Sequence, residues 1–314
     1  MSRTALLFAG QGAQFVGMGK DLAAAFPTAQ VWFDRANAAL GYDLAGICFN
    51  GPELELTKTE NAQPGIYLVS WVAFQLLKER APALRFEAAA GLSLGEFTAL
   101  AAAGALGFEG GLRLVRKRGR FMQEACEKTK GGMAAVIGLD EARTREVCAE
   151  TGVVLANLNC PGQLVISGEV EEIAEAVELA KAKGAKRAVP LSVAGAYHSP
   201  LMASARPKLK AELEDTLLSP PVATVISNVT ARPYDTGEIP SRLEMSLNLV
   251  EQITSPVRWE ESMRYLLALG FTRFIELGPG KALSGFMKRI EKSAQMLNVA
   301  DVASLEETAK ALTA

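Results

Sequence analysis

Strand-like and helix-like patterns alternate along most of this chain, and this alternation limits the possible folds more than any other feature. An apolar run at residues 4–9 ends at a glycine-containing turn and is followed by a helical pattern over residues 21–40. A second short run, at residues 86–91, leads through another such turn into further helical patterns. Alternation of this kind is typical of α/β proteins. We therefore predict an α/β fold built on a mainly parallel sheet. The other helices expected in this part cover residues 64–80, 95–106 and 108–126.

The pattern changes between residues 127 and 197. Here the sequence predicts, in order, a strand at 133–139, a helix, two strands joined by a turn, a second helix and a last strand at 185–193. This βαββαβ order is typical of the ferredoxin-like arrangement. The first kind of alternation then resumes, so we predict a small α+β domain inserted into a larger α/β one. The predicted bounds are 1–126 with 198–314 for the large domain and 127–197 for the inserted domain, and the later strands of the large domain are expected at 222–229 and 272–277.

Charge, cysteine usage and the N-terminal sequence exclude several classes of protein. The net charge is −2 and charges of both signs are mixed along the 314 residues, which argues against a nucleic-acid surface. The four cysteines contain no C-x-x-C pair and indicate neither a zinc site nor a disulfide framework. The apolar stretch within residues 1–8 is too short for a signal peptide or a membrane span. We expect a cytoplasmic protein that binds neither nucleic acid nor membranes.

The segment Gly91-Leu92-Ser93-Leu94-Gly95 forms the turn between a predicted strand and a predicted helix. Its glycines permit the tight backbone that exposes a serine hydroxyl at the end of a sheet. The helix that follows directs unpaired N–H groups at any oxyanion formed on the serine. The pattern predicts a serine nucleophile. The alternative is a glycine-rich connection without a catalytic role.

His198 is the only histidine in the chain. A serine nucleophile needs a base, and imidazole is the usual one near neutral pH. If Ser93 is activated in this way, its partner must be His198. This residue follows the last strand of the predicted insertion, where two domains would meet, and such crevices are preferred places for ligands. The alternative is a histidine on the surface or hydrogen-bonded in the core.

Helical phase distinguishes Arg118 from the other cations of the helix predicted at 108–126. At about 100° per residue, Arg118 falls within the apolar arc of this helix. Its neighbours on the opposite, polar arc are Arg113, Arg116, Lys117 and Arg120. A buried cation must find an anion, since leaving it unpaired is costly. Arg118 is therefore expected either to pair with a protein carboxylate or to grip a substrate carboxylate through two parallel hydrogen bonds.

Two other glycine-containing turns follow predicted strands. Gln11 lies in the first of them and could face the same crevice as Ser93, although a plain structural turn is the alternative, since the lysine and Ser/Thr signature of a phosphate loop is absent. The turn Gly278-Pro279-Gly280 is expected to be structural, although the helix that it opens could face an anion.

Taken together, the motifs of this chain resemble those of the malonyl-CoA:acyl-carrier-protein transacylase family, in the same order and over nearly the whole length. The matching segments are Gly10-Gln11-Gly12-Ala13-Gln14, Gly91-Leu92-Ser93-Leu94-Gly95-Glu96, Arg118-Gly119-Arg120-Phe121-Met122-Gln123-Glu124, Asn159-Cys160-Pro161-Gly162-Gln163, Ala196-Tyr197-His198-Ser199, Gln252 followed by Pro256-Val257-Arg258-Trp259, and Glu276-Leu277-Gly278-Pro279-Gly280-Lys281.

The resemblance implies a hydrolase-like α/β domain with an inserted ferredoxin-like domain. It also implies that Ser93 is the acylated nucleophile and His198 its base. The remaining implied roles are a backbone carbonyl of Gln252 that orients the imidazole, an oxyanion hole from the backbone N–H groups of Gln11 and Leu94, binding of the malonyl carboxylate by Arg118, and a place in the cleft for Asn159.

The implied reaction moves a malonyl group from malonyl-CoA to the phosphopantetheine thiol of acyl carrier protein through a malonyl-serine intermediate, which would supply fatty-acid biosynthesis. No metal, nucleotide or redox cofactor is implied. Because acyl carrier proteins are acidic, Lys117, Arg120 or Lys281 could help to dock one. The oligomeric state stays open, and a monomer is one option.

Two positions relate to the family pattern in a special way. Leu92 stands where the family usually has histidine, whereas Tyr197, directly before the histidine, tends to accompany malonyl rather than branched acyl groups. Three alternative functions remain at this point. They are a discrete polyketide-type acyltransferase, a serine esterase or thioesterase, against which the missing His-Gly-Gly oxyanion loop counts, and a non-enzymatic protein that binds the carrier.

Overall fold

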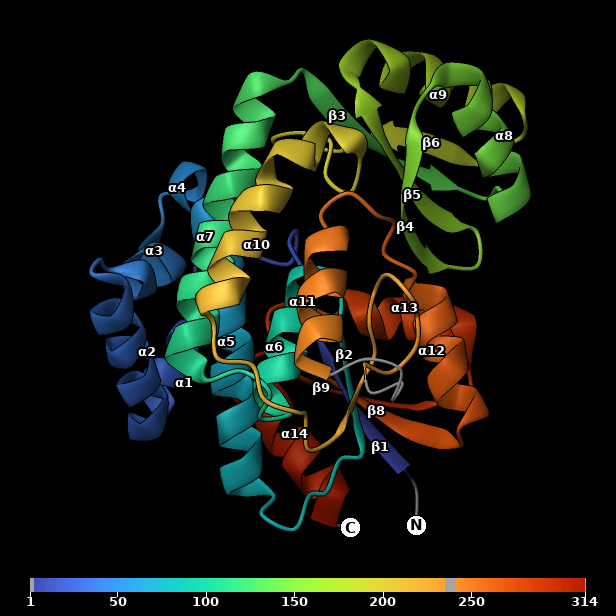
Figure 1. The fold of residues 1–314 in the computed structure, drawn as a ribbon. Coiled ribbons are helices and arrows are strands. Elements are labelled where there is room, and N and C mark those ends of the chain that lie inside the picture. Colours follow the sequence, from blue (N-terminus) through green and yellow to red (C-terminus); the bar gives the residue numbers. More distant parts are fainter. Residues whose placement is uncertain (1–2, 235–240, 314) are drawn as a thin grey trace.

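The structure, a computed structural model, describes residues 3–234 and 241–313 and contains two separate sheets (Figure 1). The larger sheet has the strand order β7-β2-β1-β8-β9, and all of its neighbouring strands are parallel. The strands are β1 (Arg3–Phe8), β2 (Ala88–Gly91), β7 (Thr224–Val225), β8 (Phe271–Leu277) and β9 (Gln295–Val299). β1 and β2 are almost wholly buried, as expected for central parallel strands covered on both faces. The predicted α/β fold class is confirmed.

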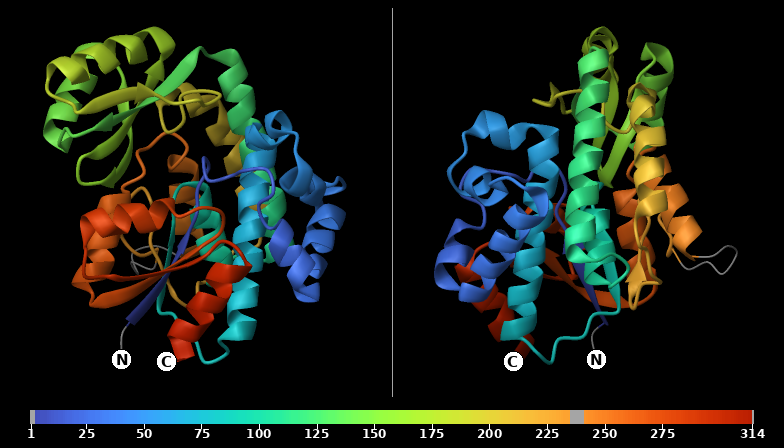
Figure 2. Two further views of the ribbon diagram at one scale, coloured as in Figure 1. Left: turned by 180° about the vertical axis from the view of Figure 1, so that it is seen from behind. Right: turned by 60° about the vertical axis from the view of Figure 1, so that its left-hand side comes forward.

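Helices surround this sheet on both sides (Figures 1 and 2). They are α1 (Lys20–Ala25), α2 (Pro27–Leu40), α3 (Leu44–Asn50), α4 (Glu53–Thr57), α5 (Thr59–Arg80), α6 (Leu94–Ala102), α7 (Phe108–Lys128), α10 (Arg206–Asp215), α11 (Ser241–Glu251), α12 (Trp259–Ala268), α13 (Ala282–Ile290) and α14 (Val302–Thr313), with a short 3₁₀ helix at Pro200–Ala205. None of the helices in the described ranges is long and apolar enough to cross a membrane.

The smaller sheet has four antiparallel strands in the order β4-β5-β3-β6. Its elements are β3 (Gly131–Ile137), α8 (Glu141–Thr151), β4 (Val154–Cys160), β5 (Gln163–Glu169), α9 (Val170–Ala182) and β6 (Arg187–Pro190). This is the predicted βαββαβ order, and the two helices cover one face of the sheet (Figure 1). The residue bounds of the two domains stay a prediction.

The single helix predicted over residues 21–40 is wrong, because the structure has two helices there. Phe26 adopts an extended conformation between α1 and α2, and Pro27 opens the second helix. Proline disfavours a helical conformation in the residue before it and cannot donate the backbone hydrogen bond of a helix interior. The chain therefore breaks the helix at Phe26.

The long apolar helix begins earlier than predicted. The sequence indicates residues 64–80, with proline at the first helical position, whereas α5 begins at Thr59 and carries Pro64 inside. A proline there leaves the carbonyl of Glu60 without its usual partner four residues on. Burial of nearly every residue from Thr59 to Phe74 outweighs this loss, so tertiary packing decides where the helix starts.

Edge strands of the larger sheet account for two further differences. The strand predicted at 222–229 shortens to the two residues of β7, and β9 has no counterpart in the prediction. Both lie at the two edges of the sheet, where a strand has one neighbour and a weaker apolar pattern. The other predicted elements lie at their predicted places with ends shifted by a few residues, whereas α3, α4, α10, α11, α12 and α14 have no counterpart in the prediction.

Chain connections bring the two sheets together. The long helix α7 leads from the large sheet directly into β3, and the chain returns after β6 through the segment that contains His198 (Figures 1 and 2). Backbone hydrogen bonds also join the small sheet to the segment before α12. Leu158 of β4 donates its N–H to the Val257 carbonyl oxygen at 2.9 Å, and Val257 donates its N–H to the Ala156 carbonyl oxygen at 2.8 Å. The carboxyl ends of β1 and β2 therefore face the edge of the small sheet.

Candidate active site

Ser93 occupies the sharp turn between β2 and α6, in a strained conformation with φ 51° and ψ −103°. Close backbone approaches explain the glycines on both sides. A Cβ at Gly91 would lie 1.9 Å from the Gly95 carbonyl carbon, and one at Gly95 would lie 2.2 Å from the Phe8 oxygen. Only glycine fits at either position. The turn that the sequence predicts is present, and it holds the Ser93 side chain at the carboxyl edge of the parallel sheet.

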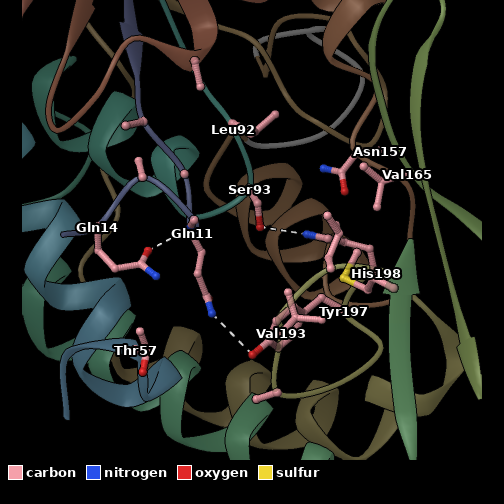
Figure 3. A pocket seen from close by; sticks show the side chains of 18 of the residues that line it. Gln11, Gln14, Thr57, Leu92, Ser93, Asn157, Val165, Val193, Tyr197 and His198 are labelled. Atoms are coloured by element: carbon pink, nitrogen blue, oxygen red, sulfur yellow. Dashed lines mark hydrogen bonds between the residues drawn. The ribbon is translucent and has the colours of Figure 1, made fainter. Parts of the chain in front are cut away.

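His198 lies directly beside this serine. Its Nε2 is 2.9 Å from Ser93 Oγ (Figure 3). Its Nδ1 is 2.8 Å from the backbone oxygen of Gln252. A carbonyl oxygen can only accept a hydrogen bond, so the proton of a neutral imidazole must sit on Nδ1. Nε2 is then free to accept the proton of the serine hydroxyl. The structure thus brings together all three residues in the geometry of a nucleophile, its base and an orienting group.

The environment of His198 keeps the imidazole neutral. Its side chain is buried, and the desolvation together with the nearby charge of Arg118 lowers its pKa to about 4. At neutral pH the ring therefore stands ready as a base.

Arg118 is buried, with 1% of its surface exposed, as its helical phase predicts. Its guanidinium donates from NH2 to Ser93 Oγ at 3.0 Å and to Gln252 Oε1 at 2.8 Å, and from NH1 to Gln63 Oε1 at 2.8 Å. All three acceptors are uncharged, so the expectation of a structural ion pair with a protein carboxylate is wrong within the described residues.

The Arg118 guanidinium also keeps an unused donor. Its Nε–H is buried and has no hydrogen-bond partner among the residues that the structure describes. Burial lowers the Arg118 pKa to about 10, which still leaves the group charged at neutral pH. A buried cation next to a serine hydroxyl, with no carboxylate in direct contact among the described residues, suits a carboxylate-binding site.

The first strand-to-helix turn lies against the serine turn. A Cβ at Gly10 would come within 2.4 Å of the Leu92 oxygen, which shows how closely the two backbones pass. The backbone N–H groups of Gln11 and Leu94 make no hydrogen bond within the described ranges. The Gln11 side chain is held by Gln63 and by the Tyr197 hydroxyl, at 3.2 and 3.3 Å. Two unused donors thus flank the serine in the arrangement of an oxyanion hole.

A cavity of about 550 Å³ opens in front of Ser93, between the two sheets (Figure 3). Tyr197 lines it beside His198, and its hydroxyl is 2.6 Å from Thr59 Oγ1. Leu92 contributes an apolar side chain to the same wall. From β4, Asn157 and Asn159 complete the lining, and the buried Asn159 Oδ1 has no partner in the described part of the chain. Arg118 and Gln252 do not line the cavity themselves but are hydrogen-bonded to Ser93, which does.

Sequence reasoning missed two residues of this site. Asn228 Oδ1 accepts the Ser93 N–H at 2.6 Å, and its Nδ2 donates to the Gly91 oxygen at 2.8 Å, so this side chain closes the serine turn. Gln63 connects Arg118 to Gln11. Both lie far from Ser93 in sequence, and neither belongs to a pattern that marks a site.

The turn Gly278-Pro279-Gly280 leads from β8 into α13, and the helix start beyond it faces a carboxylate of the protein itself. The buried carboxylate of Glu276 accepts the backbone N–H groups of Leu283 and Ser284 at 3.0 and 2.7 Å. It therefore stabilises the N-terminus of α13, where a negative charge is favourable.

Comparisons with known proteins agree with this geometry. Residues 5–311 match the family model of the acyl transferase domain. The chain is 45% identical over 311 residues to the malonyl CoA-acyl carrier protein transacylase of Bacillus subtilis (strain 168), covering 98% of this chain and 96% of that protein.

Solved structures give the same result. The malonyl CoA-acyl carrier protein transacylase from Clostridium perfringens superposes with a TM-score of 0.93 at 39% identity, covering 99% of this chain and 98% of that one. A malonyl-transacylase in complex with a type II PKS acyl-carrier protein gives 0.93 at 38% identity, with 99% and 100% covered. The chain belongs to the acyl transferase domain family, and the resemblance found in its motifs is confirmed.

Proposed function

We propose that this chain transfers a malonyl group from malonyl-CoA to the phosphopantetheine thiol of acyl carrier protein, for fatty-acid biosynthesis, through an ester on Ser93. One observation carries the proposal. Ser93 Oγ lies between His198 Nε2 at 2.9 Å and Arg118 NH2 at 3.0 Å. A base for the attack and a cation for a substrate carboxylate thus meet at one hydroxyl. The pair of His198 and Arg118 suits acyl groups that end in a carboxylate.

In the first half-reaction, His198 Nε2 takes the proton of Ser93 while Oγ attacks the thioester carbonyl carbon. The tetrahedral oxyanion is stabilised by the N–H groups of Gln11 and Leu94. As the C–S bond breaks, the imidazolium returns the proton to the sulfur and CoA leaves as a thiol. The Gln252 carbonyl keeps the ring oriented throughout, because it binds the Nδ1 proton.

The second half-reaction reverses these steps with a different thiol. His198 takes the proton of the phosphopantetheine thiol, and the sulfur attacks the malonyl-serine carbonyl. The bond to Oγ then breaks, and His198 returns the proton to Ser93. Acyl transfer rather than hydrolysis requires that water be kept from this ester, and the buried floor of the cavity supports such exclusion.

Arg118 is proposed to bind the malonyl carboxylate. One methylene separates this carboxylate from the thioester carbonyl, so the cation that binds it must lie within a few ångströms of the nucleophile. The Nε–H is unused, and the NH2 hydrogen that now binds Ser93 Oγ can turn to the carboxylate instead, which gives two parallel hydrogen bonds. Tyr197, held by Thr59 beside His198, is proposed to fill the space that a branched acyl group would need.

The second substrate is proposed to be an acyl carrier protein, like the partner of the solved malonyl-transacylase. Two of the three cations suggested for docking are already engaged, since Lys117 pairs with Glu212 and Arg120 with Glu124. Lys281 is exposed next to Ala282, which lines the cavity, so it is the better docking candidate.

The cysteines support a cytoplasmic location, which is part of the proposal. Cys48, Cys126, Cys148 and Cys160 are all free thiols. Disulfides are rare where thiols are kept reduced.

Mass spectrometry of the intact protein after mixing with malonyl-CoA tests the first half-reaction. We expect one malonyl group on the wild-type chain and none on the Ser93→Ala variant. Absence of the adduct on the wild-type chain would contradict the proposal and would favour a carrier-binding protein without catalysis.

Supply of a polyketide pathway is the second candidate, because one similar structure is a malonyl-transacylase bound to a type II PKS acyl-carrier protein. The chemistry on Ser93 is the same in both cases, so only the carrier distinguishes them. Values of kcat/KM with a fatty-acid carrier and a polyketide carrier decide between the two, and we expect the fatty-acid carrier to be preferred.

A further inference from the structure

Glu96 is a buried carboxylate beneath the proposed active site, and the mechanism above does not use it. It lies in the first turn of α6, and 1% of its surface is exposed. Three donors converge on it. The hydroxyl of Tyr234 donates to Oε1, whereas Gln252 Nε2 and the backbone N–H of Asn228, the latter at 3.2 Å, donate to Oε2. None of the three carries a positive charge.

The Gln252 side-chain amide lies between Glu96 and Arg118. Its Nε2 donates to Glu96 Oε2 and to the backbone carbonyl oxygen of Ser93. Its Oε1 accepts from Arg118 at 2.8 Å. A guanidinium has only donors, and a carboxylate has only acceptors. Reversing the amide would therefore place donor against donor at Arg118 and acceptor against acceptor at Glu96. The acceptor on Glu96, together with the Ser93 backbone oxygen, thus fixes which end of the amide faces the arginine.

Asn228 gives Glu96 a second connection to the site. Its backbone N–H is bound to Glu96, while its side chain accepts the Ser93 N–H at 2.6 Å. The same carboxylate thereby holds one residue that orients Arg118 and one that closes the serine turn.

We propose that Glu96 is a positioning residue for acyl selection: through the Gln252 amide it holds the Arg118 guanidinium beside Ser93 and so favours acyl groups that end in a carboxylate. This inference rests on the proposed function, because it assumes that Arg118 binds the substrate carboxylate. Without the acceptor on Glu96, the amide keeps only the Ser93 backbone oxygen at 3.0 Å and Asn228 Oδ1 at 3.4 Å as acceptors, so it holds Arg118 in place less firmly. Misplacement of a binding group by about 1 Å costs on the order of 100-fold in rate.

The position requires an acceptor at Oε2 rather than a negative charge. Burial raises the pKa of Glu96 to about 7. A proton on Oε1 can be donated to the Tyr234 oxygen, and Oε2 still accepts from Gln252. Glutamine can do the same, with its amide oxygen toward Gln252 and its NH2 group toward Tyr234. Leucine offers no acceptor at all, so Glu96→Gln and Glu96→Leu form a matched pair.

The test compares kcat/KM for malonyl-CoA and acetyl-CoA in Glu96→Leu and Glu96→Gln, each alone and combined with Arg118→Ala. We expect Glu96→Leu to lower the malonyl-to-acetyl ratio by about tenfold or more, and Glu96→Gln to keep it within about threefold of the wild-type value. In the Arg118→Ala background, Glu96→Leu should leave the ratio unchanged, because the arginine through which it acts is missing.

Three results would overturn the inference. They are an equal loss with both acyl groups in Glu96→Leu, the same change of ratio with and without Arg118, and a Glu96→Gln variant as impaired in the ratio as Glu96→Leu. Should Glu96→Leu fail to fold, Gln252→Met cuts the connection in its middle and leaves the other two donors of Glu96 in place. It should lower the ratio equally, and a wild-type ratio in this variant would reject the inference. Failure of the proposed function itself would give a different result, because the wild-type chain would then form no malonyl ester with malonyl-CoA.

Discussion

Arg118 places a positive charge in the interior of the protein, and no carboxylate of the described residues contacts it directly; Glu96 acts on it only across the Gln252 amide. Its acceptors are side-chain amide oxygens of Gln63 and Gln252 and the Ser93 hydroxyl, and its Nε–H is unused in the described residues. A structural arginine would be expected to have an acidic partner. The helical phase of α7 is sufficient to predict that this arginine is buried, but not which groups it contacts, because those groups come from three other elements.

Replacing Arg118 with alanine should therefore act selectively. We expect malonyl transfer to lose about 2–4 kcal/mol of transition-state stabilisation, because a charged, bidentate interaction is removed, while acetyl transfer persists or rises. Steady-state kcat/KM values with the two CoA thioesters measure the effect. Arg113→Ala, on the exposed side of the same helix, is the control. Equal losses with both acyl groups would exclude Arg118 as the carboxylate-binding group.

The buried imidazole should make the free energy of unfolding depend on pH. The His198 pKa is about 4 in the folded protein and about 6.5 in an unfolded chain, so the unfolded state binds the proton more readily. The stability that this group contributes is complete above pH 6.5 and is lost as the pH falls toward 4.

Between pH 7.5 and pH 5, the wild-type chain should lose about 2 kcal/mol more than the His198→Gln variant. Urea unfolding at the two pH values measures this difference. An equal loss in both proteins would show that the imidazole is not desolvated as the structure indicates.

At the scale of elements, the strand-to-helix turns place the reactive groups. β2 and α6 hold Ser93, and the turn after β1 holds Gln11 against it through the approach of Gly10 to Leu92. Glycine spacing and strand–turn–helix order are local signals, so the sequence was enough to predict both turns. Asn228 and Glu96 could not be assigned a role in this way, since their contacts depend on how distant elements pack.

The glycine after the serine offers a direct test of this turn. Alanine at Gly95 would place a Cβ 2.2 Å from the Phe8 oxygen, a backbone atom of β1 that cannot move without disturbing the sheet. We expect Gly95→Ala to destabilise the fold by about 1–3 kcal/mol or more and to abolish acylation. Gly110→Ala in α7, where a Cβ has nothing within 4 Å, should be neutral or stabilising. Urea unfolding of both variants gives the comparison, and equal stabilities would contradict the described packing.

At the scale of the whole molecule, the residues of the proposed site come from the chain before and after the inserted small sheet. Ser93 and Arg118 precede it, His198 and Gln252 follow it, and β4 contributes the opposite wall of the cavity. Alternating patterns were sufficient to predict the fold class and the order of the small sheet. The edge strands β7 and β9 and the start of α5 were not predictable locally, because neighbouring elements determine them.

The Arg289 side chain links the large part of the molecule to the small sheet. From α13 it donates to Gln163 Oε1 at 2.8 Å and to the Pro161 oxygen at 3.0 Å, at the turn between β4 and β5. Arg289→Ala should weaken this attachment by about 0.5–1.5 kcal/mol for each bond lost. Amide hydrogen exchange in β4 and β5 should then quicken, with Lys288→Ala as the exposed control on the same helix. Unchanged exchange would show that the contact does not hold the small sheet in place.

Transfer from an isolated malonyl-enzyme tests the central claim most directly, because it requires Ser93, His198 and the cavity in front of them to act together. The malonyl-enzyme is freed of CoA and then divided between buffer alone and buffer with phosphopantetheinylated acyl carrier protein, and both proteins are followed by mass. We predict a long-lived ester in buffer and rapid appearance of the malonyl group on the carrier. Equally fast loss of the ester in both samples, with no malonyl group on the carrier, would identify a hydrolase and contradict the proposed transfer.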